Sequence, residues 1–148
     1  MPYLKITSPS LEPTRYQVIS QRLTEAVNDL FYTPSARLTR EQLRERTTVH
    51  FVPHADHELY IGGQTPVARG LADVTVELSD WSMSVRQQRK IARTLTPVLA
   101  ELFNIPAKDI DHVNIRFYSY SPADFAVGGK LLSDLIPLVG RWAKRLLG

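Results

Sequence analysis

The sequence predicts an α+β fold made of two tandem strand-helix-strand units. Three observations support this: an internal repeat, β-rich runs on both sides of each predicted helix, and a Gly-Gly turn at the end of each unit. Residues 6–31 align without a gap with residues 78–103, so that Ile6 falls on Leu78 and Phe31 on Phe103. We therefore expect a four-stranded mixed sheet with two helices on one face.

The strand predictions come from runs rich in β-branched and aromatic residues. The four runs cover 3–7, 47–52, 74–78 and 113–118. Each unit then ends in a similar turn, with Gly62-Gly63 in the first and Gly128-Gly129 in the second. The chain is predicted to be one domain over 1–148, divided into repeat one (about 2–63), a linker (64–72), repeat two (about 73–129) and a C-terminal tail (130–148).

The two predicted helices are amphipathic, with apolar residues at helical spacing along one face. These residues are Tyr16, Ile19, Leu23, Val27 and Leu30 in the first helix, and Ile91, Leu95, Val98 and Leu102 in the second. Pro13 suits the first turn of a helix, whereas Pro97 lies inside the second pattern and predicts a bend. The tail from 130 to 148 is predicted to add an amphipathic segment that seals an oligomer.

Right-handed crossovers give each unit two parallel strands in a common sheet. With both helices on one face, the other face stays uncovered. We expect that open face to be apolar and to be covered by a closed ring of subunits, because the strands carry many apolar side chains. These side chains are Leu4, Ile6, Val49, Phe51, Val74, Val76, Ile115 and Phe117.

The composition excludes several classes of protein. The 148 residues are 43% hydrophobic and 22% charged, as in a packed globular domain. The absence of cysteine excludes a disulfide scaffold, a thiolate nucleophile and any zinc site with cysteine ligands. No apolar run reaches about 18 residues and no signal-peptide pattern opens the chain, so we expect a cytoplasmic protein without a membrane partner. A net charge of +3 is too small to predict nucleic-acid binding.

Pro2 directly follows Met1 at the start of the first predicted strand. Together with the duplicated unit and the two Gly-Gly turns, this resembles the tautomerase superfamily over residues 2–129. Segment 49–53 is similar to a strand of macrophage migration inhibitory factor, 60–63 to a turn of 4-oxalocrotonate tautomerase, and 121–125 to malonate semialdehyde decarboxylase. The resemblance implies a homotrimer with an active site around each N-terminal proline at a subunit interface.

The predicted catalytic residue is Pro2. Methionine before proline is ordinarily removed, which leaves a rigid secondary amine as the chain terminus. An α-amino group has a pKa near 7.7 to 8.0, and burial in an apolar pocket lowers that pKa. The neutral amine can act as the general base of a keto-enol or allylic isomerisation without any cofactor or metal. The structural alternative is a proline tolerated at a strand start, where its missing N-H is not needed.

Three further residues are predicted to bind a small carboxylate substrate, a 2-oxo or enol acid. Arg116 supplies the cation, and alternation along its strand puts Asn114 on the same face. By resemblance, Asn114 and Arg116 occupy positions that line the pocket in the family, and Phe125 matches a hydrophobic pocket residue. The alternatives are a salt bridge of Arg116 with Asp124 or Glu77 and core packing of Phe125.

The sequence contains two further clusters of basic side chains. His50, His54 and His57 follow a spacing across a strand and a loop that does not predict a metal site. One of Arg37, Arg40, Arg44 and Arg46 is a candidate carboxylate ligand, against a solvated charge run.

The chain also departs from the family patterns. The family's arginine after the first strand is Ser10 here, and its arginine pair after the third strand is replaced by Ser79, Asp80 and Trp81. The leading hypothesis is a tautomerase. The alternatives are a sibling hydratase, dehalogenase or decarboxylase that uses protonated Pro2, and a non-catalytic binding protein.

Overall fold

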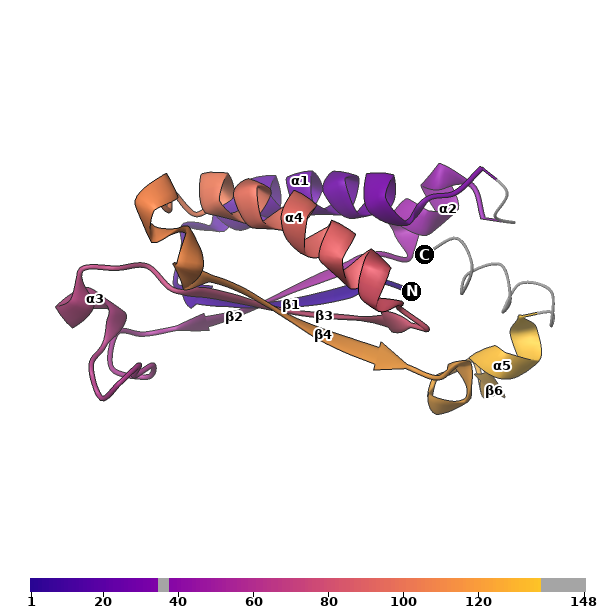
Figure 1. Cartoon of the computed structure of the whole chain (residues 1–148). Coiled ribbons are helices and arrows are strands. Elements are labelled where there is room, and N and C mark those ends of the chain that lie inside the picture. Colours follow the sequence, from indigo (N-terminus) through magenta and orange to yellow (C-terminus); the bar gives the residue numbers. More distant parts are fainter. Residues whose placement is uncertain (35–37, 137–148) are drawn as a thin grey trace.

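The computed structural model describes residues 1–34 and 38–136, and a four-stranded mixed sheet forms its centre. The strand order is β2-β1-β3-β4, with β1 and β3 in the middle (Figure 1). The two central strands are antiparallel, and each outer strand runs parallel to its neighbour. This is the predicted pair of strand-helix-strand units. The strands are β1 (Tyr3–Pro9), β2 (Thr48–His54), β3 (Val74–Trp81) and β4 (Val113–Tyr120).

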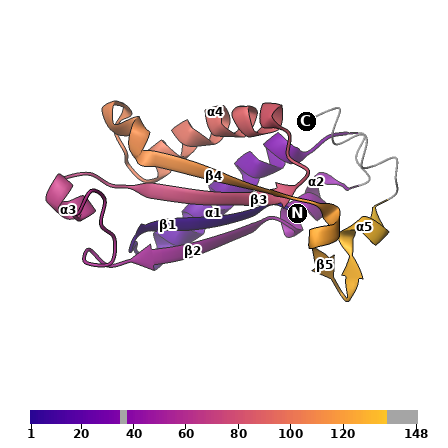
Figure 2. The same ribbon diagram turned by 60° about the horizontal axis from the view of Figure 1, so that its bottom comes forward.

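Two long helices, α1 (Pro13–Phe31) and α4 (Val85–Leu102), lie side by side on one face of the sheet (Figures 1 and 2). Their apolar faces are the predicted ones, with Ile19, Leu23 and Leu95 fully buried in the core. Pro13 occupies the first turn of α1. Pro97 lies on an exposed position of α4, and the helix continues on both sides of it. The fold class is therefore confirmed.

Several short elements were not predicted from the sequence, because each is shorter than a periodic pattern can reveal. Helix α2 begins at a capping box in which Thr39 and Gln42 satisfy each other's backbone N-H groups. The C-terminal tail contributes β6 and α5, and its residues 137–148 lie outside the described part of the chain. The short elements are α2 (Arg40–Glu45), α3 (Pro66–Arg69), the 3-10 helices η1 (Ala107–His112) and η2 (Pro122–Asp124), β5 (Ala126–Val127), β6 (Lys130–Leu131) and α5 (Leu132–Leu135).

The two Gly-Gly turns repeat the same backbone conformation. Gly62 and Gly63 have φ of 61° and 78°, and Gly128 and Gly129 have φ of 58° and 76°. Two successive residues with positive φ make the tight turn that favours glycine in hairpins. The second turn joins β5 to β6, while the first is closed by an isolated bridge from Ile61. The internal repeat therefore extends into the loops.

The open face of the sheet is polar, and the expectation of an apolar open face is wrong. All eight apolar strand residues cited for it belong to the covered face, as the register shows by pairing Leu4 with Val49 and Leu78 with Phe117. Alternation then sends the residues between them to the open face. These include Tyr3, Lys5, Thr7, His50, Glu77, Arg116 and Tyr118. The apolar strand residues need only the helix layer, so they give no reason to expect a ring of subunits.

Candidate active site

The N-terminus lies at the end of the sheet where β3 and β4 finish (Figures 1 and 2). Pro2 is buried, and its carbonyl oxygen accepts a hydrogen bond of 3.0 Å from the Thr48 N-H of β2. The antiparallel register pairs Tyr3 with Ser79, so one step further places Pro2 opposite Asp80. Neighbouring strands therefore fix the position of Pro2 from both sides.

Asp80 is a buried carboxylate at this end of the sheet. It is only 1% exposed, and its Oδ1 lies 2.6 Å from the terminal ammonium nitrogen of Met1. The pKa of the neighbouring Tyr120 is raised to about 12, mainly because the phenol is partly buried and further because Asp80 is negative. The chain terminus and Asp80 thus form an ion pair at the end of β3.

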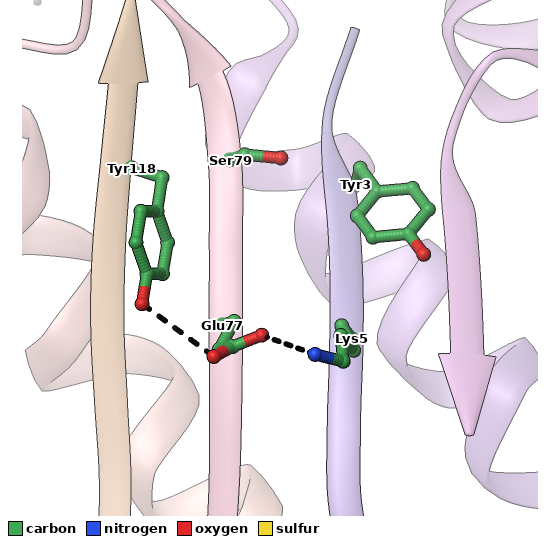
Figure 3. Close-up of a pocket in the computed structure, with 5 residues that line it drawn as sticks. All are labelled: Tyr3, Lys5, Glu77, Ser79 and Tyr118. Atoms are coloured by element: carbon green, nitrogen blue, oxygen red, sulfur yellow. Dashed lines mark hydrogen bonds and ion pairs between the residues drawn. The ribbon is translucent and has the colours of Figure 1, made fainter. Parts of the chain in front are cut away.

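A shallow hollow of about 310 Å³ opens on the polar face beside this end. It is lined by Tyr3, Lys5, Glu77, Ser79 and Tyr118, which come from three strands (Figure 3). In the hollow, Lys5 Nζ lies 2.9 Å from Glu77 Oε2, and the Tyr118 hydroxyl donates to Glu77 Oε1 at 3.5 Å. Tyr3 follows Pro2 in β1 and Ser79 precedes Asp80 in β3, so the hollow begins one residue away from both groups but on the opposite face of the sheet from the Asp80 side chain.

The charges in the hollow support each other. The hydrogen bond and charge of Glu77 raise the pKa of Lys5, and the same hydrogen bond with Lys5 lowers the pKa of Glu77. Arg116 also lowers the pKa of Glu77, through its charge alone. At neutral pH the open face therefore carries a row of Lys5, Glu77 and Arg116 in one register across three strands.

Arg116 is exposed on β4, and no hydrogen bond or ion pair of its guanidinium is found among the described residues. The alternative of a salt bridge with Glu77 or Asp124 is therefore not formed in the described part of the chain. Arg116 lies in the row of Lys5, which is three residues or about 10 Å along the strand from Pro2. Its guanidinium is thus available to an anion on the open face.

Asn114 is exposed on the same face of β4, but farther away. It shares a row with Thr75 and Thr7, five residues or about 17 Å along the strand from Pro2. A single chain therefore does not bring Asn114 to its own N-terminus.

Phe125 follows η2 at the end of the sheet that holds Pro2. It is half-buried, and its ring centroid lies 5.7 Å from that of Tyr120. Asp124 next to it caps η2 by accepting from the Ser121 N-H at 3.0 Å. Phe125 thus packs on the tyrosine whose pKa the charge of Asp80 helps to raise.

The remaining cationic candidates differ in their contacts, and among them Arg46 and His57 are exposed. The His50 ring Nδ1 lies 2.6 Å from the Tyr3 hydroxyl on the open face, while His54 is buried at the opposite end of β2. Arg40 and Arg44 form exposed ion pairs with acidic residues of α1. Arg37 lies outside the described residues. Within 1–34 and 38–136, no group of three or more His, Asp or Glu side chains could hold a metal ion.

Sequence reasoning missed Asp80 as a site residue. The signal was present, because the covered face of β3 reads Val74, Val76, Leu78 and then a carboxylate. The internal alignment puts Ser8 at the equivalent place in β1. A charged residue at a buried strand position calls for a partner, and the chain terminus is that partner here.

No family model matches the chain, and no curated protein sequence matches it. Solved structures do match. A fused 4-oxalocrotonate tautomerase described as an asymmetric trimer superimposes with a TM-score of 0.72 at 16% identity, covering 90% of this chain and 98% of that one. A member of the cis-3-chloroacrylic acid dehalogenase family gives 0.67 at 16% identity, with 98% and 97% covered.

Macrophage migration inhibitory factor of Toxoplasma gondii gives a TM-score of 0.62 at 16% identity, with 87% of this chain and 98% of that chain covered. These three similarities show a shared fold. The chain therefore has the tautomerase superfamily fold, as its sequence motifs indicated. No helix in the described residues is both long enough and apolar enough to cross a bilayer.

Proposed function

We propose that this chain is a cofactor-independent tautomerase that isomerises a small 2-oxo or enol carboxylic acid. The general base is the secondary amine of Pro2, set free by removal of Met1. The carrying observation is the placement of the chain terminus: Pro2 is buried at the start of β1, bonded to Thr48 and next to a buried carboxylate. That terminus lies in a fold shared with 4-oxalocrotonate tautomerase.

The chemistry needs a base that cannot move away from the substrate. Proline supplies this because its ring prevents rotation of the amine about the N-Cα bond. The hydrogen bond from the Thr48 N-H to the Pro2 carbonyl oxygen then holds this part of the backbone on β2. The neutral amine removes a proton from an enol oxygen or from a carbon next to a carbonyl, and becomes an ammonium. The ammonium then returns a proton to another carbon, which completes the isomerisation.

A cation must hold the substrate carboxylate during this transfer. Arg116 is the proposed anchor, because its guanidinium faces the open side of the sheet without a partner among the described residues. A guanidinium binds a carboxylate through two parallel hydrogen bonds. Phe125 supplies apolar contact at the end of the sheet that holds Pro2, and Asn114 supplies a polar contact from the far row.

The site is proposed to be completed by a second subunit. Asn114 and Arg116 lie about 17 Å and 10 Å along the strands from Pro2 of their own chain, so one small molecule cannot touch all three groups within one chain. A matching fused 4-oxalocrotonate tautomerase is described as a trimer. In a homotrimer of this chain, repeat two of one subunit would supply Arg116 and Asn114 to Pro2 of its neighbour.

The test starts with intact-protein mass spectrometry, which must show a chain that begins at Pro2. Turnover of phenylenolpyruvate and 2-hydroxymuconate is then measured for that chain and for a version with extra residues fused before Pro2. The extension turns the amine into an amide, so we expect loss of about 10²- to 10⁴-fold in rate. Equal rates for both chains would show that Pro2 is not the base.

Assembly is tested separately by light scattering at micromolar concentration. We expect the mass of a homotrimer, both for the processed chain and for the extended one, because the extension changes the site and leaves the sheet intact. A folded monomer with full activity would contradict the shared site.

A further inference from the structure

We propose, on the basis of the function above, that Asp80 is a positioning residue for the Pro2 amine. Its carboxylate orients the amine and stabilises the ammonium that forms when the amine accepts a proton from the substrate. The role resembles that of a buried carboxylate beside a catalytic histidine, which holds the base in place and stabilises its protonated form.

The geometry comes from the position of Met1. Met1 N lies 2.6 Å from Asp80 Oδ1, and standard bond lengths place Pro2 N no more than about 3.7 Å from Met1 N. Pro2 N is therefore within about 6 Å of the carboxylate, even if nothing moves when Met1 is removed. The Thr48 hydrogen bond and the register with β3 hold Pro2 at this place. Opposite charges at about 4 to 6 Å shift a protonation equilibrium measurably.

Burial strengthens this effect. The Asp80 side chain is 2% exposed, so little water screens its charge from the terminus. Burial of the amine alone would favour its neutral form, and the adjacent carboxylate favours the charged one. The two influences act in opposite directions, and Asp80 decides how readily the amine accepts a proton.

Other titratable groups surround this end of the sheet. Tyr120 on β4 stays neutral over the assay range, because its pKa is about 12. Tyr3 and His50 form a hydrogen-bonded pair on the open face, with the Lys5 and Glu77 ion pair beyond them. Exposed cations on the adjoining elements include Arg46 at the end of α2 and Arg86, Arg89 and Lys90 in the first turns of α4.

The experiment measures the Pro2 amine directly, by ¹⁵N NMR titration of the processed protein. Asp80→Asn keeps the size of the side chain and removes its charge. We expect the pKa of the amine to fall by about one unit or more, the size of effect that a nearby opposite charge produces. The acid limb of the kcat/KM profile should move to lower pH by the same amount, and kcat at its optimum should fall about tenfold with KM changed less.

Two variants serve as controls. Asp80→Glu keeps the carboxylate and should restore most of the pKa. Asp73→Asn removes a carboxylate that is also buried, at the other end of β3, and the amine should titrate as in the unaltered protein. Equal amine pKa values in Asp80→Asn and the unaltered protein would overturn the proposal.

A further measurement uses the unaltered protein and needs no variant. In the unaltered protein, the ¹³C signal of the Asp80 carboxylate should show an inflection at the pKa of the Pro2 amine, because the two charges interact. A carboxylate signal that stays flat through that pH would also overturn the proposal. An amine that responds to Asp80 in a protein without tautomerase turnover would instead reject the proposed function and retain the ion pair.

Discussion

The two ends of the central β1 and β3 pair follow one antiparallel register but carry different groups. At one end Pro2 lies across from Asp80, and at the other end the same register brings Ser8 across from Val74. Val74 is internal to the chain and has no amine to offer. Asp73 next to it is also buried, but its carboxylate is held by Arg69 at 3.4 Å and by His112 at 3.0 Å.

The two ends of this duplicated fold differ in the kind of partner that their buried aspartate has. Both ends bury an aspartate at the edge of the core, and both aspartates have a cationic partner. At the Asp73 end the partners are side chains, which make a fixed structural contact. At the Asp80 end the partner is the chain terminus, the one group in the proposed mechanism that exchanges a proton with the substrate.

The largest effect is expected from Pro2→Ala, which makes the two ends more alike. The variant keeps a terminal amine, but the amine becomes primary and rotates about its Cα–N bond, so its lone pair no longer points in the one direction that the proline ring fixes. We expect a loss of about 10²-fold or more in kcat/KM, with a small part of the base catalysis retained. Steady-state assays with phenylenolpyruvate check this after mass spectrometry confirms removal of Met1. A variant as active as the unaltered protein would argue against a fixed proline base.

Arg116→Ala tests whether repeat two serves the Pro2 end of another subunit. The loss of a charged hydrogen-bonding partner costs about 1.5 to 3 kcal/mol, so we expect kcat/KM to fall roughly 10- to 100-fold while the fold is kept. Circular dichroism verifies the fold. Refolding Arg116→Ala together with Pro2→Ala should restore part of the activity, because some mixed trimers contain one intact site. Unchanged kinetics would remove Arg116 from the site.

Asp73→Asn addresses the opposite end. The change removes the negative charge and replaces one of the two acceptor oxygens that face Arg69 and His112 by an NH2 group, so we expect a loss of about 1 to 3 kcal/mol in the free energy of unfolding. Urea unfolding measures this loss. Turnover at temperatures well below unfolding should be unaffected, because the group is remote from Pro2. A large loss of turnover in a stable Asp73→Asn protein would show that the two ends are not chemically separate.

The smallest effect is expected from Glu77→Gln in the middle of the open face. Lys5 lowers the pKa of Glu77, so the pair stabilises the fold above the unfolded value of 4.5 and loses this contribution as pH falls through the lower folded pKa. The pKa of Lys5 is raised, so its share is lost above about pH 10.5. The effect is small because both groups are exposed to solvent. Thermal unfolding at pH 7 and pH 3 should differ slightly less in the variant than in the unaltered protein.

The fold could be predicted because the sequence repeats its own pattern. Two amphipathic helices and four β-rich runs recur at one spacing, and the Gly-Gly turns recur with them. The expectation of an apolar open face was wrong, because alternation along each strand sends the apolar residues to the helix-covered face. Once Leu4 and Ile6 face the helices, the intervening Tyr3 and Lys5 must face outward.

The candidate site was predicted less completely than the fold. Pro2 could be found from its place in the sequence, and Arg116 from its place on a strand. Asp80 could not be linked to Pro2 without the strand register, because 78 positions separate them in the sequence. Only the antiparallel pairing of β1 with β3 brings them together. Contacts across such distances depend on strand pairing, which local patterns do not specify.

The pairing of β1 with β3 also sets the order of events when the chain folds. Each half can pair its own strands through a short crossover, whereas the Tyr3 and Ser79 pairing requires two distant segments to meet. Long-range strand pairing is the slow step in small domains. The ion pair of the N-terminus with Asp80 joins β1 to β3, so it forms only when the two halves of the chain pair. During refolding, helix content should therefore recover before turnover, because turnover needs this pairing and, in the proposed shared site, assembly of the subunits as well.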